Sequence, residues 1–165
     1  MTLRTRNHTP RASGASDPAC DPEGLLQDYW LELAQLYDEF GSAIGDAARR
    51  RIAERICHAV AAQCDVEEEL LYPAATRLSD RPDNRLRAAQ LEGAFVRKIA
   101  EQIRSLSHGD QRLAGTLDVL KAYIADYLEQ QRTDVMPRLV RQDPHVTGLC
   151  QAMQYRRAQI LGDAR

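Results

Sequence analysis

Large apolar residues recur at intervals of three and four positions through most of this chain. Side chains at that spacing share one face of a helix, so each such stretch predicts an amphipathic helix with one buried stripe. The first helix is expected to begin at Asp21-Pro22-Glu23, where a capping acid precedes a first-turn proline. The four predicted stripes are Leu26, Trp30, Leu33, Tyr37 and Phe40; Ile52, Ile56, Ala59, Val60, Gln63, Glu67 and Leu70; Leu86, Ala89, Gly93, Val96, Ala100 and Ile103; and Leu113, Leu117, Leu120, Ile124, Tyr127 and Gln131.

Glycine and short polar residues separate these stretches. Gly41 and Gly45 lie between the first and the second, and Asp46 can cap the second helix. A loop around Ser79–Asn84 precedes the third helix, which ends at Ser107-His108-Gly109. No stretch alternates β-branched and polar residues in the way that a strand requires. Four amphipathic helices with short connections predict an all-α fold, an up-down-up-down four-helix bundle.

The predicted bundle covers residues 22–141. Residues 142–165 are expected to form a short additional C-terminal helix, from roughly Val146 to Ile160, that packs on the bundle. Residues 1–21 contain many Thr, Arg, Ser, Pro and Ala and almost nothing large and apolar, which predicts a disordered N-terminal tail. No apolar run follows the arginines of this tail, so it does not predict a secretory signal.

Two polar pairs interrupt the apolar stripes in the same way. Gln63 and Glu67 lie ten and six positions before one proline, and Tyr127 and Gln131 lie ten and six positions before another. Residues four apart share a helix face, so both pairs are expected to point into the core. Buried polar groups are costly unless they are hydrogen bonded, which indicates a polar centre between the helices.

Four stretches of the chain carry a family likeness. The most specific is Val66-Glu-Glu-Glu-Leu-Leu-Tyr-Pro73. Weaker matches are Leu25–Trp30 continuing to Leu36–Phe40, Leu91–Lys98, and Val135-Met-Pro-Arg138. With these stretches the chain resembles the hemerythrin-like family, also called HHE cation-binding domains, over about residues 22–140.

The resemblance implies where a metal centre once lay. Family members bind a non-haem iron pair through histidines from all four helices, with a Glu four residues after a His on the second and fourth. Carried over to this sequence, those places form a former metal-centre cluster, of which only Glu67 keeps the family's ligand. A shift of one residue would put Tyr29 in the place on the first helix and would still restore no histidine. The six places are Trp30, Gln63, Glu67, Gly93, Tyr127 and Gln131.

These replacements predict that no metal is bound. Trp30 and Gly93 cannot coordinate a metal, and the two glutamines offer only neutral amide oxygens, which are poor replacements for imidazole. Glu67 and Tyr127 would serve as ligands only if an altered iron site survived. The expected alternative is a repacked core, in which Trp30 fills the space that Gly93 vacates and Glu67 is hydrogen bonded to Tyr127 or to a glutamine.

Composition and motifs argue against several classes of function. The 165 residues have a formal net charge of -2, which provides no overall field for nucleic acid. No apolar run approaches the roughly 20 residues of a membrane span. Cys20, Cys57, Cys64 and Cys150 form no CxxC motif, which favours reduced thiols and a cytoplasmic location. No nucleophile–base pair, phosphate loop or acid–base dyad is evident, so the sequence predicts that the protein is not an enzyme.

Three hypotheses follow, in this order. The first is a metal-free, non-enzymatic interaction or regulatory module that binds an unknown protein partner. The second is a small-molecule binder that uses the former metal cavity, with Glu67, Tyr127 and the amides as polar contacts. The third, implied by the resemblance, is an oxygen, nitric oxide or iron-related protein with an altered site.

Overall fold

The computed structural model of the protein describes residues 21–79 and 83–162. All regular structure in these residues is helical, which confirms the predicted all-α class. The predicted N-terminal tail lies, except for its last residue, outside the described residues. The elements are α1 (Pro22–Ser42), α2 (Asp46–Val66), η1 (Glu67–Leu71), α3 (Tyr72–Arg77), α4 (Asn84–Ser105), α5 (Arg112–Gln130), η2 (Gln131–Val135), α6 (Met136–Gln142) and α7 (Val146–Gly162).

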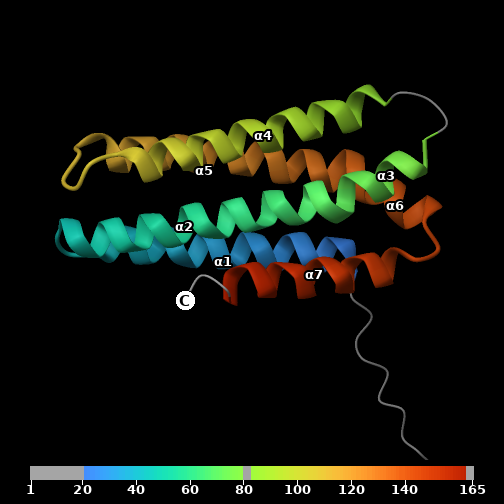
Figure 1. The fold of residues 1–165 in the computed structure, drawn as a ribbon, viewed down its shortest axis with the longest axis horizontal. Helices are drawn as coiled ribbons and strands as arrows, with labels where there is room; N and C mark the ends of the chain where they lie inside the picture. Colours follow the sequence, from blue (N-terminus) through green and yellow to red (C-terminus); the bar gives the residue numbers. More distant parts are fainter. Residues whose placement is uncertain (1–20, 80–82, 163–165) are drawn as a thin grey trace, which may run out of the picture.

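The four long helices α1, α2, α4 and α5 run along the long axis of the molecule (Figure 1). α2 packs against both α1 and α4, and α4 packs against α5. The turns that join α1 to α2 and α4 to α5 lie at the same end, on the left of Figure 1. α7 lies along α1 and α2 and contacts both. The core therefore lies between these helices, with α7 covering one side of the α1–α2 pair.

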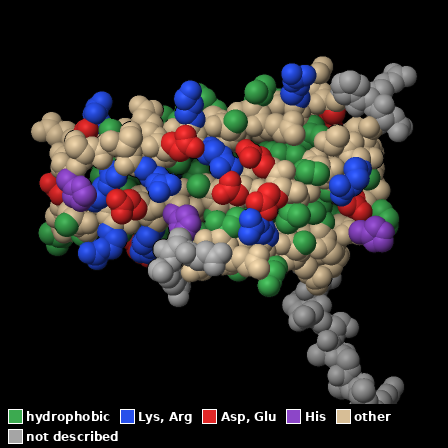
Figure 2. Space-filling model, in the orientation of Figure 1, with side chains coloured by type: hydrophobic (Ala, Val, Ile, Leu, Met, Phe, Trp, Pro, Cys, Tyr) green, Lys and Arg blue, Asp and Glu red, His purple; other side chains and the backbone are tan. Residues whose placement is uncertain are grey.

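Charges of both signs are mixed on one face of the molecule. Figure 2 shows acidic and basic side chains interspersed over the face that it presents. Among the described residues, none of the helices is both long and apolar enough to cross a membrane. Cys57 and Cys64 are buried thiols that form no disulfide.

The buried face of α1 differs from the predicted stripe. Trp30 and Phe40 are only partly buried, whereas Tyr29 and Leu36 are 4% and 5% exposed. Both sets of residues satisfy the spacing of three and four, so periodicity alone could not choose between them. α7 decides the outcome, because it packs beside α1 and places the Arg157 guanidinium 5.2 Å from the centre of the Tyr29 ring.

Two π-helical turns, which the apolar periodicity does not predict, follow the second and the fourth long helix. Each lies just before a proline, at Pro73 and at Pro137. Proline lacks an N–H group and its ring collides with the carbonyl four residues earlier, so a regular α-helix cannot continue through it. A π turn is wider than an α turn and moves that carbonyl away from the proline ring. In this turn the Tyr72 amide donates to the carbonyl of Glu67, five residues earlier. Residues five apart are thereby brought towards one face of the helix.

Arg50 fastens the start of α2 to the end of α4. Its guanidinium donates hydrogen bonds to the carbonyls of Ile103, Arg104 and Leu106 at 3.2, 2.7 and 2.9 Å. The last carbonyls of a helix lack partners within it, so this side chain supplies donors to the Arg104 and Leu106 carbonyls and adds a second donor to the Ile103 carbonyl, which also accepts from the Leu106 N–H. Arg50 is 8% exposed, and Glu54 balances its charge at 2.9 Å.

Replacing Arg50 by Met is expected to lower the free energy of unfolding by about 1 to 2 kcal/mol, because the three hydrogen bonds to carbonyls and the ion pair with Glu54 are lost while the apolar stem is kept. Arg51→Met is the matched control, since Arg51 is the next residue and is exposed. Chemical unfolding followed by circular dichroism measures both. Equal losses in the two variants would contradict this role for Arg50.

Candidate functional site

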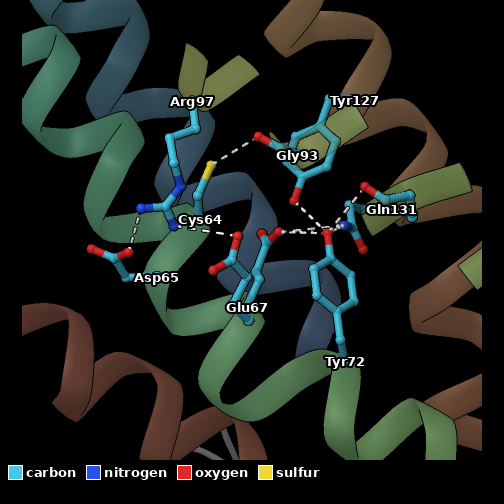
Figure 3. A network of polar contacts seen from close by, with 10 residues as sticks. Cys64, Asp65, Glu67, Tyr72, Gly93, Arg97, Tyr127 and Gln131 are labelled. Carbon is cyan, nitrogen blue, oxygen red and sulfur yellow. Dashed lines mark hydrogen bonds and ion pairs between the residues drawn. The ribbon is translucent and has the colours of Figure 1, made fainter. Parts of the chain in front are cut away.

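Five of the six predicted cluster residues lie close together in the core. Glu67 and Gln131 are fully buried, and Gln63 and Tyr127 are 2% exposed. Gly93 on α4 lies against the hydroxyls of Tyr127 and of a second tyrosine, Tyr72 (Figure 3). These five residues form a polar centre between the three long helices α2, α4 and α5, with the π turns η1 and η2. The sixth residue, Trp30 on α1, lies outside this centre.

Glu67 is the acceptor at this centre. Gln63 Nε2 donates to its Oε1 at 2.7 Å. The Tyr72 hydroxyl and Gln131 Nε2 donate to its Oε2 at 3.3 and 3.4 Å. The expected hydrogen bond from a glutamine is therefore present, and both glutamines provide one. A carboxylate at this depth needs such donors, because burial without them disfavours the charged form.

Tyr72 joins the hydrogen bonds of this network, although it lies on none of the predicted apolar stripes. Its hydroxyl lies 2.9 Å from the Tyr127 hydroxyl, 3.2 Å from the carbonyl of Ala89 and 3.1 Å from Gln131 Nε2 (Figure 3). One phenol proton can serve either Glu67 or Ala89, while the oxygen accepts from Gln131 and Tyr127. Its position in the sequence could have indicated this role, because Tyr72 lies five residues after Glu67 and directly before Pro73. A π turn before that proline would bring residues five apart towards the same face of the helix.

Gly93 makes room for this pair of tyrosines. A Cβ atom built on Gly93 would lie 3.2 Å from the hydroxyl oxygens of both Tyr72 and Tyr127. The expectation that Trp30 fills the space vacated at Gly93 was therefore wrong. The two tyrosine hydroxyls fill the space that a side chain at position 93 would take. They approach the α4 backbone closely because glycine has no side chain there.

Trp30 lies in a groove on the outside of α1 and α5. The groove has a volume of about 240 Å³, and Leu26 and Leu128 also line it. Tyr29 instead faces the polar centre. This is the arrangement expected if the place on the first helix is shifted by one residue, from Trp30 to Tyr29. Burial raises the pKa of its phenol well above 10, and the negative charge of Glu67 acts in the same direction. Adjacent helix residues point about 100° apart, so only one of the two aromatics could face inwards.

The buried carboxyl titrates near neutral pH. Burial raises the pKa of Glu67 from 4.5 to about 7, although the hydrogen bonds from Gln63 and Tyr72 oppose that rise. Burial also raises the pKa of Tyr72 far above its usual range. The Cys64 thiol, which donates to the carbonyl of Gly93 at 3.6 Å, has its pKa raised by burial as well. The centre thus offers one titrating acid among groups that keep their protons.

An iron pair does not fit this set of side chains. Within residues 21–79 and 83–162, no three His, Cys, Asp or Glu residues gather as metal ligands would. Both glutamines turn their N–H groups towards Glu67. The other side of the Gln131 amide, its Oε1 atom, is buried and accepts no hydrogen bond from the described residues. A cation needs lone pairs, and here N–H donors surround the carboxylate.

Comparison with known proteins finds no family model, no curated protein and no solved structure that matches this chain. The resemblance to the hemerythrin-like family therefore stays a prediction.

Proposed function

We propose that this chain is a hemerythrin-like up-down-up-down four-helix bundle, extended by α7, that has lost its iron centre and acts as a non-enzymatic interaction module. The observation that carries this proposal is the closure of the Glu67 site by hydrogen-bond donors from Gln63, Tyr72 and Gln131. The proposal includes a cytoplasmic location, with Cys57 and Cys64 as reduced thiols.

The closed network supports a structural role for the centre. The two glutamine amides direct N–H donors at the carboxylate oxygens of Glu67, which are the atoms that would bind a metal ion. An N–H donor stabilises the carboxylate charge that a cation would otherwise balance. The two tyrosine hydroxyls already crowd the space in front of Gly93, which leaves little room for a small molecule beside Glu67. The function is then carried by the outer surface of the bundle.

An altered iron site has weaker support. It would use Glu67 with the phenolates of Tyr127 and Tyr72. The high pKa of Tyr72 opposes the loss of its proton, and burial is the main cause of that high value. Binding would also require both glutamine amides to turn their N–H groups away from Glu67.

We expect the purified protein to hold far less than one iron, manganese or zinc ion per chain, and to lack the visible absorption of an oxygen-bridged iron pair. Elemental analysis after gel filtration, together with an absorption spectrum, measures this. Added iron should leave the melting temperature unchanged, because a ligand stabilises a fold only in proportion to how well it binds.

A triple variant provides the matched contrast. Gln63→His, Tyr127→His and Gln131→Glu place a His four residues before a Glu on both helices, as the family resemblance implies. This variant is expected to gain iron affinity if the family's ligand places are assigned to the correct residues of this sequence. Stoichiometric iron in the unaltered protein would overturn the metal-free proposal. A triple variant that folds but gains no iron affinity would count against the assignment of the family's ligand places to these residues.

A further inference from the structure

One side of the bundle exposes an apolar ridge. Eight large hydrophobic residues are exposed in the described parts of the chain, and four of them lie together on α4 and α5. These two helices form the upper layer of Figure 1, away from α7. We call this set the α4–α5 ridge: Leu91, Phe95, Val119 and Tyr123, which are 66%, 47%, 48% and 44% exposed.

The ridge has a hollow and an aromatic centre. The Phe95 and Tyr123 rings pack edge to face, with their centroids 5.0 Å apart. A groove of about 260 Å³ opens beside them, and Leu91 lines it. Apolar side chains exposed together beside a concavity are typical of a surface that another protein covers.

Charges lie at equal distances on the two sides of this centre. Glu92 is three residues before Phe95 on α4, and Lys98 is three residues after it. At 1.5 Å per residue, each lies about 4.5 Å along the helix from the ring. Asp126 lines the groove on the same side as Glu92.

None of these charges is compensated by an opposite charge in the described residues. Partial burial raises the pKa of Glu92, and the negative charge of Asp126 adds to the rise. Lys98 is exposed and forms no ion pair within the described part of the chain. Two mutually repelling carboxylates therefore lie on one side of the aromatic centre, and an unpaired ammonium lies on the other.

We propose that the α4–α5 ridge binds a second copy of this chain, with a twofold axis that crosses the two helices at the level of Phe95 and Tyr123. Such an axis lays α4 on the partner copy's α4 in the opposite direction, so the aromatic centres meet. Each Lys98 then faces the Glu92 and Asp126 carboxylates of the other copy. The surface is self-complementary, with an apolar centre and two symmetrical charge contacts.

This inference rests on the proposed interaction function, since it names the partner of that module. Metal content is measured on the same samples, so a metal-free monomer would overturn the dimer and leave the metal-free proposal standing.

The first experiment is sedimentation velocity of the full chain over a range of concentrations. We expect a species with twice the 18.6 kDa mass of the chain. Phe95→Glu is expected to give a folded monomer, and Leu31→Glu, at an exposed leucine on α1, is expected to remain dimeric. A monomer at every concentration, or a dimer that survives Phe95→Glu, would overturn the proposal.

The second experiment exchanges the charges. Lys98→Glu and Glu92→Lys should each weaken self-association by about tenfold or more, because each places like charges opposite one another. A mixture of the two single variants should form heterodimers, since both contacts are then between opposite charges. The double variant Lys98→Glu/Glu92→Lys should also recover self-association. A mixture that associates no better than either variant alone would overturn the antiparallel arrangement, and circular dichroism verifies that each variant is folded.

Discussion

Raising the pH from about 5 to about 8 is expected to cost the folded protein on the order of 3 kcal/mol through Glu67 alone, and the substitution Glu67→Gln is expected to remove that loss. The cause is the pKa of this carboxyl, which burial raises from 4.5 to about 7 in the folded chain.

The sign follows from proton binding. Between the unfolded and folded pKa values of Glu67, the folded chain holds a proton that the unfolded chain releases. Rising pH therefore favours unfolding across this interval. The stabilising contribution is fully present below about pH 4.5 and is lost once the pH has passed about 7.

Urea unfolding at intervals of pH measures the effect. The difference in unfolding free energy between the wild type and Glu67→Gln should change with pH, with the variant gaining relative to the wild type as the pH rises. Glu101→Gln, at an exposed carboxyl on α4, is the matched control and should follow the wild-type curve. Parallel curves for the wild type and Glu67→Gln would show that Glu67 does not titrate in this interval.

The apolar periodicity of the sequence was sufficient for the helices and most of their buried faces. Leu33, Ile56, Ile103 and Leu120, all on predicted stripes, are at most 1% exposed. Burial of large side chains dominates the energetics of such helices, so a stripe at the helical period determines which face is inside.

Other features depended on contacts that periodicity cannot encode. Tyr29 and Trp30 are adjacent aromatics that fit the same pattern equally well, and the position of α7 selects Tyr29. Tyr72 lies off the face of Glu67 on a regular α-helix, and the π turn before Pro73 brings it back. The spacing of the two polar pairs predicted that Glu67 and its neighbours are buried, but Tyr72, which joins their hydrogen bonds, is brought to them by a helical irregularity.

Tyr72→Phe is expected to lower the unfolding free energy by about 3 kcal/mol, although only one oxygen is removed. That oxygen lies within hydrogen-bonding distance of Glu67, Ala89, Tyr127 and Gln131. Each buried polar group left without a partner costs about 1 to 3 kcal/mol, so the loss exceeds that of an ordinary hydrogen bond.

Tyr37→Phe is the matched control, because among the described residues its buried hydroxyl makes a single hydrogen bond, to the carbonyl of Leu117 at 3.2 Å. We expect it to cost about 1 kcal/mol. The two variants should also differ in pH dependence. The hydroxyl of Tyr72 stabilises the ionised form of Glu67, so its removal raises the pKa of that carboxyl further. The cost of Tyr72→Phe should therefore grow as the pH rises through 7, whereas the cost of Tyr37→Phe should stay constant. A cost for Tyr72→Phe that equals the control and does not vary with pH would mean that Tyr72 packs beside Glu67 without holding its charge.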